Sequence, residues 1–554
     1  MIALRGVVMV DDREAREKPP SLIEAMARPE FYPDRPANVE LRQTHISYVF
    51  LAGEYVYKVK KPVRFSFLDY STLCKRYHFC QEELRLNRRL APTVYLEVVP
   101  IMQREGKYAL GEQLRTAGRW TLAEYAVKMR RLPEKRMLDT MVKEGRVGKE
   151  EIHAIVERLV SFHLAAATDR ASVFGAPETI WLKFANNFKE TERLIGQTIT
   201  QKESRAIQEF GRRFLMENRD LLQARLCQQR IREGHGDLRA EHICLTGDIV
   251  VYDCIEFDER LRYCDVASEI AFLAMDLDFL GASKLSEELV AAYREIAQDE
   301  TLCQLLSFYK CYRAYVRGKV ESLKSQEKEV PDAERNLSKA QAKRYFHLAY
   351  RYAKGTPAPA LLIVCGLVGT GKSTTARLLG DLTGFVVFNS DSVRKRLAHI
   401  PPTARVQSGY RTGIYSDNST RLTYEILLAE AERTLKDGRG VIVDATLKDP
   451  RHRGHFLNLA ARLKIPILFA ECQAQGRDIF RRLQERGSLR DEVSDATWNV
   501  YLRHQENFVP LTDIPDDRHL TVNTETALEE GITRIEEFLW NRGNYEIPNS
   551  SIFR

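Results

Sequence analysis

Residues 366–373 carry the strongest chemical signal in the sequence. They read GLVGTGKS and match the pattern G-x-x-x-x-G-K-[ST]. Glycines let backbone N–H groups turn inward around phosphate oxygens, and a following helix N-terminus adds partial positive charge. The pattern assigns Lys372 to the β- and γ-phosphates of ATP and the Ser373 hydroxyl to Mg²⁺. The residues expected at the nucleotide are Gly366, Gly369, Thr370, Gly371, Lys372, Ser373 and Thr374.

Two carboxylates follow later apolar stretches. Asp391 lies in FNSDSVRKRL, where we expect it to end a strand, and Asp444 ends VIVD. The carboxyl ends of parallel strands meet at one ligand crevice, so both should converge with the phosphate loop. We assign Asp444 to magnesium and Asp391 to the proton of an attacking hydroxyl. Arg394, about one helical turn after Asp391, suits an anionic acceptor.

An arginine-rich segment follows, RRLQERGSLRDEVSDA. Its Arg482 and Arg486 are four residues apart and would share one helix face. In a phosphate-loop fold such a segment can close as a lid over the transferring phosphate. The alternative is an ordinary charged helix.

Together, GLVGTGKST, SDSVR, VIVDAT and the arginine-rich segment resemble the small P-loop kinases that group with zeta toxin, chloramphenicol phosphotransferase and the kinase part of polynucleotide kinase. The resemblance covers about residues 360–510. It implies phosphoryl transfer, with Asp391 as general base and Arg394 at the acceptor. It does not identify the acceptor.

A second motif begins at His235-Gly-Asp237. An apolar stretch, the turn TGD and the stretch IVVYD follow, and the last of these ends at Asp253. A β-hairpin returns the chain to near its start, so Asp237 and Asp253 should share one site. A loop aspartate followed by a metal aspartate after a hairpin is the arrangement of protein kinases.

This segment resembles aminoglycoside phosphotransferases and choline-kinase-like enzymes, whose motif reads H-G-D-x-x-x-x-N. The resemblance implies a catalytic Asp237, metal ligands at Asp253 and residue 242, and a structural aspartate in Asp265-Val-Ala. Residue 242 is His in HGDLRAEH, where the family has a magnesium-binding Asn. Histidine prefers softer metals than magnesium, which places activity at this site in question.

The sequence EYVYKVKK holds the lysine expected to contact phosphate in this second site. Lys58 and Lys60 fall on the same strand face, so the alternation of side chains does not choose between them. The resemblance favours Lys58. Glu83 is the better candidate for its helix partner, and Glu82 is the alternative.

Two units must position these groups. The stretch KGTPAPA stops helices and separates them. We expect a polar extension at 1–20, an α+β aminoglycoside-phosphotransferase-like unit at 21–353, a linker at 354–359, an α/β P-loop kinase unit with a parallel sheet at 360–545 and a tail at 546–554. The first unit should begin with a hairpin about Gly53 and continue as a helical body, and its stripe Ile152, Ile155, Val156, Leu159 and His163 predicts a buried helix face. The order of units is similar to that of a bacterial family that fuses an aminoglycoside-phosphotransferase-like domain to a P-loop ATP-binding domain.

Composition narrows the function classes. The 554 residues are 44% hydrophobic and 29% charged, with a net charge of +7. These values exclude a disordered chain and are too mild to indicate a nucleic-acid-binding protein. Ten scattered cysteines without a C-x-x-C pair predict a reduced, cytoplasmic protein, and no apolar stretch is long enough to span a membrane.

The leading hypothesis is an ATP- and Mg²⁺-dependent phosphotransferase. Its P-loop unit would phosphorylate a small hydroxylated molecule, and its first unit would be a second kinase or a regulator. One alternative is nucleic-acid 5′-end phosphorylation, suggested by VRKRL and DPRHR. Another is a non-catalytic switch driven by ATP occupancy.

Overall fold

The computed structural model describes residues 4–5, 21–65, 68–113, 119–168, 170–327, 330–401, 413–487, 498–506, 508–525 and 528–541. It divides into two compact units, Met1–Ala349 and Tyr350–Arg554. The division falls within helix α13 (Asp332–Lys354), just before the proposed linker.

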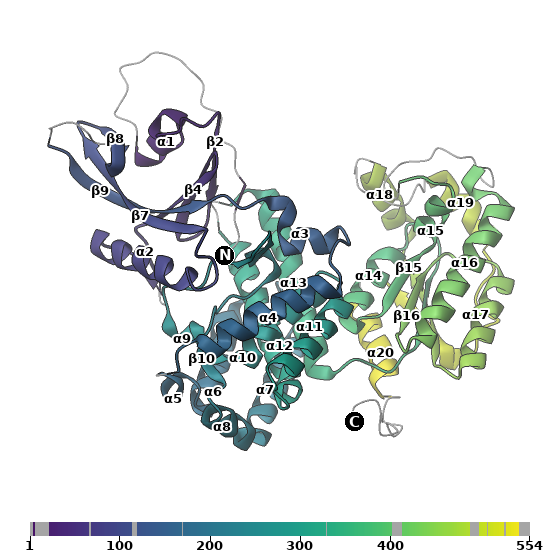
Figure 1. The fold of residues 1–554 in the computed structure, drawn as a ribbon. Helices are drawn as coiled ribbons and strands as arrows, with labels where there is room; N and C mark the ends of the chain where they lie inside the picture. Colours follow the sequence, from purple (N-terminus) through teal and green to yellow (C-terminus); the bar gives the residue numbers. More distant parts are fainter. Residues whose placement is uncertain are drawn as a thin grey trace, which may run out of the picture. The chain divides into compact units, whose positions relative to one another are not determined.

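The first unit begins with a seven-stranded antiparallel sheet in the order β1-β2-β3-β4-β9-β7-β8 (Figure 1). The predicted hairpin about Gly53 is confirmed, with Ser47 opposite Lys60 and Ala52 opposite Tyr55. The strands are β1 (Leu4–Arg5), β2 (Val39–Gln43), β3 (Ser47–Ala52), β4 (Tyr55–Lys60), β7 (Tyr95–Arg104), β8 (Lys107–Leu110) and β9 (Thr121–Arg130). Strand β1 lies in the stretch expected to be an extension, and a short ribbon of β5 (Arg64–Phe65) and β6 (Leu68–Asp69) follows β4.

A different helix packs on each face of this sheet. Helix α1 (Leu22–Met26) covers the face that carries Tyr57 and Val59, and α2 (Leu73–Asn87) packs against β7 and β9 on the other face (Figure 1). Because side chains alternate along a strand, Lys58 and Lys60 both point toward α2. The sheet thus presents two lysines to one helix.

The rest of the first unit is helical, and two small two-stranded antiparallel sheets are inserted in it. The helices are α3 (Leu138–Lys143), α4 (Lys149–Ala165), α5 (Ala171–Phe174), α6 (Pro177–Thr191), α7 (Gln201–Glu217), α8 (Arg219–Cys227), α9 (Glu259–Arg262), α10 (Val266–Phe279), α11 (Ser283–Ile296), α12 (Leu302–Lys324) and α13. The paired strands are β10 (Ile231–Glu233) with β13 (Tyr263–Asp265), and β11 (Ile243–Leu245) with β12 (Ile249–Val251). The stripe predicted on α4 is buried along its whole length, and α10 is buried on nearly all sides.

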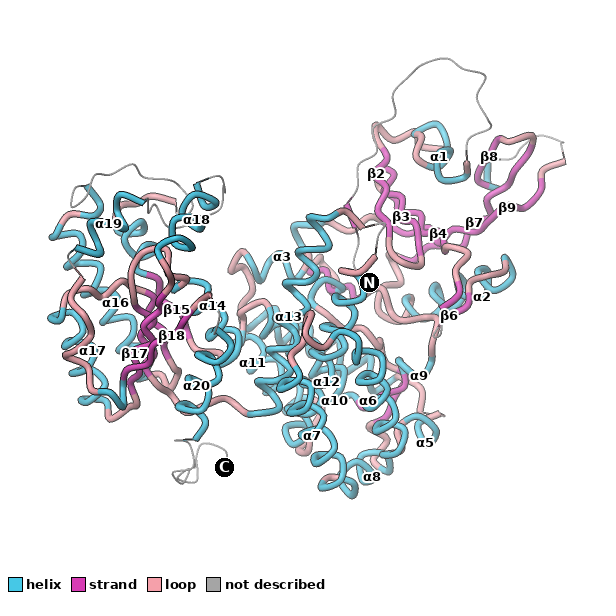
Figure 2. Tube along the Cα trace, turned by 180° about the vertical axis from the view of Figure 1, so that it is seen from behind, coloured by secondary structure: helices cyan, strands magenta, loops and turns pink. Residues whose placement is uncertain are grey.

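The second unit is a five-stranded parallel sheet in the order β15-β16-β14-β17-β18, which confirms the predicted α/β class. Its strands are β14 (Leu361–Cys365), β15 (Val386–Asn389), β16 (Val441–Asp444), β17 (Ile467–Gln473) and β18 (His519–Asn523). Continuous apolar strands need cover on both faces. Figure 2 shows α16 and α17 on one side of these strands and α14 and α20 on the other.

The helices of this unit are α14 (Lys372–Thr383), α15 (Ser390–Leu397), α16 (Asp417–Lys436), α17 (Pro450–Leu463), α18 (Gly476–Gly487), α19 (Trp498–Glu506) and α20 (Leu528–Asn541). Helices α18 and α19 pack on each other and on the phosphate-loop residues Leu367 and Val368. No helix in the described part of the chain has the length and apolarity that a membrane crossing requires.

Candidate functional site

The phosphate loop connects the central strand β14 to α14. The backbone of Gly366 has φ +125°, and a Cβ on this residue would lie 2.4 Å from the carbonyl oxygen of Cys472. Gly371 has φ +90° and is the N-cap of α14. Both positions therefore require glycine, and the loop follows a path that side chains would obstruct.

Hydrogen bonds hold this loop at both ends. The Nζ of Lys372 and the Oγ1 of Thr370 donate to the carbonyl oxygen of Leu367, at 2.8 and 2.7 Å. Thr524, directly after β18, donates through its hydroxyl to the carbonyl of Thr370 at 2.7 Å. The ammonium group of Lys372 thus lies over the loop where bound phosphate oxygens would be contacted.

Asp444 lies beside this loop because the register of the sheet places it there. It is opposite Val364 of β14 on one side and Asn389 of β15 on the other. The Nδ2 of Asn389 donates to its carboxylate at 2.6 Å. Burial raises the pKa of Asp444, whereas the charge of Lys372 and hydrogen bonds from Ser373 and Asn389 oppose that rise. A carboxylate next to a serine hydroxyl forms a set of oxygen donors of the kind that Mg²⁺ prefers, so the side chains present fit this ion.

Asp391 lies in the first turn of α15, and the expectation that it ends a strand is wrong. The strand ends at Asn389, whose side chain accepts from the Ser392 N–H and caps the helix. Asp391 contacts Arg394 across one helical turn, with Oδ1 2.7 Å from Nη1. The guanidinium group lies 4.8 Å from the ring centroid of Tyr415. Asp391 and Arg394 therefore lie side by side at the start of α15.

One of the two proposed lid arginines, Arg482, lies beside the phosphate loop. Arg482 on α18 donates to the hydroxyl and carbonyl oxygens of Thr524, both at 3.0 Å, and so stands beside the phosphate loop. The side chain of Arg486 lies outside the described residues. Helix α19 adds a group that the sequence did not suggest. Burial lowers the pKa of His504 to about 4, helped by Lys448, Lys372 and Arg394, so its imidazole is neutral at pH 7.

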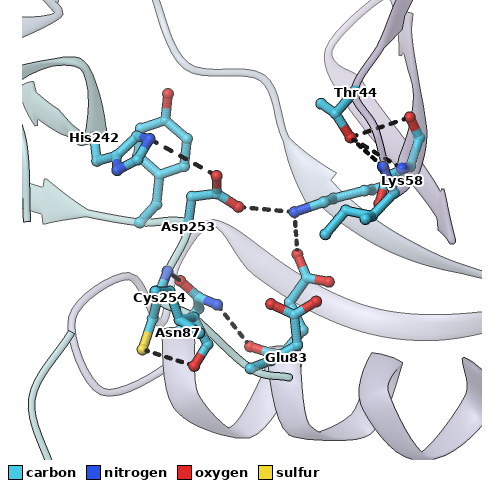
Figure 3. A network of polar contacts seen from close by, with 12 residues as sticks. Thr44, Lys58, Glu83, Asn87, His242, Asp253 and Cys254 are labelled. Carbon is cyan, nitrogen blue, oxygen red and sulfur yellow. Dashed lines mark hydrogen bonds and ion pairs between the residues drawn. The ribbon is translucent and has the colours of Figure 1, made fainter. Parts of the chain in front are cut away.

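In the first unit, the lysine and glutamate expected to pair do so in a buried network (Figure 3). The Nζ of Lys58 lies 2.7 Å from Glu83 and 2.8 Å from Asp253. Lys60 also contacts Glu83, at 2.7 Å, and additionally contacts Glu256. Lys58 thus joins the sheet, α2 and Asp253, whereas Lys60 reaches Glu256 instead. Glu82 contacts Arg85 on the surface.

Asp253 itself is held in an unusual backbone conformation. Its φ is +64°, which residues other than glycine rarely adopt and which is frequent at functional sites. Asn87 supports this turn, because its Oδ1 accepts from the Cys254 N–H at 2.8 Å while its Nδ2 donates to the carbonyl of Glu83 at 2.9 Å (Figure 3). The Asn87 side chain therefore connects the backbone at Glu83, which pairs with Lys58, to the turn that holds Asp253.

The Asp237 loop contains a cation of its own. Burial would raise the pKa of Asp237, but Arg239, whose Nε is 3.3 Å from the carboxylate, holds it well below its usual range. His242 has a pKa lowered to about 4 by burial and by Arg239. Its Nδ1 donates to the Asp237 carbonyl at 2.8 Å, and Arg239 donates to its Nε2 at 3.5 Å. Nε2 lies 3.8 Å from the carboxylate of Asp253 (Figure 3), but it already has a hydrogen-bond donor in Arg239, which disfavours its use as a metal ligand.

Among the residues described, no group of three or more His, Cys, Asp or Glu side chains is arranged to hold a metal ion. Asp265 has the structural role that the resemblance implied: it caps α10 and pairs with Arg225 at 2.6 Å.

Sequence reasoning missed several of these groups. Asn389 and Thr524 each stand at the carboxyl end of a strand, which is a signal that could have found them. Arg239 could have been noticed as a basic residue two positions after Asp237. The sequence gives no signal for His504 or Asn87, because both reach their sites from helices whose packing is tertiary. The residues of the two sites that sequence reasoning missed are Asn87, Arg239, Glu256, Asn389, His504 and Thr524.

The chain is similar to known proteins in both units. Residues 361–511 match the family model described as an AAA domain. The chain is 33% identical over 439 residues to the uncharacterized protein Rv2004c of Mycobacterium tuberculosis, a match that covers 79% of this chain and 84% of the relative. The uncharacterized protein Mb2027c of Mycobacterium bovis matches equally well. Since neither unit has 439 residues, this similarity extends into both.

Among solved structures, a choline/ethanolamine kinase family protein from Mesorhizobium loti covers 60% of this chain and 98% of its own, with 14% identity and a TM-score of 0.35. The Mycobacterium tuberculosis APS kinase CysC, solved with AMPPNP and APS, covers 33% of this chain and 98% of its own, with 20% identity and a TM-score of 0.24.

Proposed function

We propose that the P-loop unit of this chain, which belongs to the same family as Rv2004c of Mycobacterium tuberculosis, transfers the γ-phosphate of ATP to a hydroxyl group of a small acceptor. The observation that carries this proposal is the pairing of Asp391 with Arg394 at 2.7 Å, at the sheet edge where the phosphate loop and Asp444 meet. A nucleotide-binding switch needs the loop but not a carboxylate–arginine pair beside it.

Each residue has a role in the proposed reaction. The loop amides and Lys372 bind the phosphates of ATP. Asp391 accepts the proton of the acceptor hydroxyl. The hydroxyl oxygen forms a bond to the γ-phosphorus of ATP, while the bond from that phosphorus to the bridging oxygen of ADP breaks. Ser373 and Asp444 would hold Mg²⁺, which neutralises phosphate charge. Arg394 orients an anionic or polar group of the acceptor beside the base.

Charge distribution favours a small acceptor over a nucleic-acid end. The two basic segments that suggest nucleic acid are partly committed to structure. Arg453 is 0% exposed and binds Asp513 and the carbonyl oxygens of neighbouring loops. Lys395 is fully buried, and Arg396 pairs with Glu430. The fully buried side chains of Arg453 and Lys395 are not presented to a phosphate backbone.

The test uses the full chain with γ-labelled ATP and a metabolite extract, followed by separation of labelled products. We expect Lys372→Ala to lose ATP binding at the P-loop site and to lose all transfer. Asp391→Asn should keep ATP binding, measured with a fluorescent ATP analogue, and should slow transfer by about 100-fold or more, since a positioned base contributes that much. Asp437→Asn, an exposed aspartate in the same unit, is the matched control.

Three results would contradict the assignment. Transfer by Asp391→Asn at the parental rate would remove Asp391 as the base. Loss of all transfer in Asp237→Ala, with Asp391 intact, would move the reaction to the first unit. A chain that binds ATP but labels no acceptor in a single turnover would instead favour the switch.

We further propose that the first unit binds a nucleotide phosphate through Lys58. The support is the pairing of Lys58 with Glu83 and Asp253, which places one ammonium group at a site of buried carboxylates. Arg239 forms an ion pair with Asp237, with its Nε 3.3 Å from Oδ1. Binding of the fluorescent ATP analogue to Lys372→Ala, abolished by adding Lys58→Met, is the expected result.

A further inference from the structure

A pocket in the helical part of the first unit lies outside both sites described above. It encloses about 500 Å³, open space at its mouth included, and lies among α6, α9, β13 and α12. Figures 1 and 2 show α5, α6 and α9 gathered at the same end of this unit. The pocket is partly open, and solvent-filled space makes up part of that volume. Its lining includes the rings of Phe174, Phe184, Phe308, Tyr309 and Tyr312.

The pocket holds two cations whose charge the surrounding protein does not neutralise. The Nζ of Lys183 on α6 donates to the carbonyl oxygens of Phe174 and Tyr263, at 3.4 and 3.3 Å, and lies 5.8 Å from the ring centroid of Phe174. Arg313 on α12, 6% exposed, donates to the Ser268 hydroxyl at 3.1 Å and the Gly236 carbonyl at 3.2 Å. Within the described residues, neither cation lies within ion-pair distance of a carboxylate.

The one carboxylate that lines the pocket is already committed. Asp265 forms two hydrogen bonds of 2.6 Å with Arg225, which is itself fully buried. Arg260, also part of the lining, pairs with Asp258 at the surface. Buried charges are normally paired. Two cations without a carboxylate partner in one aromatic pocket therefore leave positive charge that a bound anion would neutralise.

We propose that this pocket binds an anionic small molecule with a flat aromatic body, whose acidic group lies between Lys183 and Arg313. The rings of the lining take the apolar body, and the two cations take the acidic group. Arg313 connects the pocket to the Asp237 loop, because it donates to the carbonyl of Gly236, the neighbour of Asp237. The ligand would therefore contact the same arginine that supports this loop.

The charge state of Lys183 agrees with this assignment. Burial lowers its pKa to about 8, and the nearby Arg313 and Arg260 act in the same direction, against Cys264 and Asp258. Cys264 has a pKa raised to about 12 by burial, and the pKa values of Tyr309 and Tyr312 are raised as well, so these groups stay neutral up to pH 9. Lys183 alone among these pocket groups loses its charge between pH 7 and pH 9.

The test uses the full chain and the fluorescent probe 1-anilinonaphthalene-8-sulfonate, an aromatic body with one sulfonate. We expect one saturable site. Lys183→Met should weaken binding by about 10- to 100-fold, which is what the loss of a charge-assisted hydrogen bond produces. Lys189→Met, an exposed lysine on the same helix, is the control and should bind the probe as the parent does. The parent's affinity should fall about tenfold from pH 7 to pH 9 and that of Lys183→Met should not, because only the parent loses the ammonium charge.

Folding and binding are separable in this experiment. Lys183→Met removes an uncompensated, half-buried charge, so thermal stability should be unchanged or raised. The neutral analogue N-phenyl-1-naphthylamine should bind parent and variant alike. The proposal is overturned if the sulfonate binds Lys183→Met as tightly as the parent, if the neutral analogue loses affinity to the same extent, or if no saturable site exists.

Discussion

Replacement of Glu83 by Gln tests whether the buried network of the first unit is a true ion-pair cluster. Glu83 is 0% exposed and receives a hydrogen bond from each of two lysines, both at 2.7 Å. A glutamine has nearly the same shape, but it can accept from one lysine only and presents an N–H₂ group to the other. The change therefore removes charge while leaving the packing intact.

The expected loss of stability depends on the carboxylate partner that each lysine retains. Removal of one partner from a buried ion pair costs about 3–5 kcal/mol, because it leaves a charge uncompensated. Here Lys58 keeps Asp253 and Lys60 keeps Glu256, so the cost should fall at the lower end, about 3 kcal/mol. The adjacent Glu82 gives the matched control. Its partner Arg85 is half exposed, and exposed pairs contribute about 0–1 kcal/mol.

The measurement is hydrogen–deuterium exchange of α2 and β4 in the full chain, in urea, compared among the parent, Glu83→Gln and Glu82→Gln. Exchange reports the local free energy of opening and so does not require both units to unfold together. The reasoning about burial and charge is refuted if Glu82→Gln lowers the free energy of opening as much as Glu83→Gln does. It is also refuted if both changes lower that free energy by less than about 1 kcal/mol.

Three other changes have definite expectations. Gly366→Ala should abolish binding of a fluorescent ATP analogue at the P-loop site, because its Cβ would lie 2.4 Å from a backbone oxygen, whereas Gly438→Ala, also at a positive φ but with open space around it, should bind normally. Arg225→Met should lower the free energy of unfolding of the first unit by about 3–5 kcal/mol in urea titrations, since two buried aspartates lose their partner. Burial acts to raise the pKa of Glu269, but the hydrogen bond and charge of His163 outweigh it and lower the pKa to about 2. Because the pKa is depressed in the folded state, this group stabilises the fold above about pH 4.5 and its contribution is lost as pH falls toward 2. In Glu269→Gln this part of the acid dependence should be missing from unfolding curves recorded between pH 5 and pH 2.

Local sequence determined most of the second unit. Apolar stretches separated by amphipathic ones require a parallel sheet covered on both faces, and the glycine-lysine-serine pattern between the first stretch and its helix has one structural use. The position of Asp444 followed from the same rule, because strand ends meet at one edge. The placement of Asp391 did not. The strand stops at Asn389, which caps α15, and this shifts Asp391 into the helix.

In the first unit, the sequence left two choices that only packing could make. Strand periodicity puts Lys58 and Lys60 on one face, and the sheet's pairing with α2 brings both to Glu83. What separates the two lysines is a third element, the turn after β12, which brings Asp253 to Lys58. Glu82 and Glu83 are neighbours in sequence, but their side chains leave the helix about 100° apart, and only Glu83 is fully buried toward the sheet.

The sequence by itself indicated which residues are candidates for binding phosphate, and it determined that the strands of the second unit run parallel, because both depend on local pattern and spacing. Tertiary structure decided the electrostatics. It placed Arg239 against Asp237, His504 near Lys372, and Lys183 and Arg313 in one aromatic pocket. Charge interactions depend on distance and burial between segments far apart in the chain, and neither quantity is present in the order of residues.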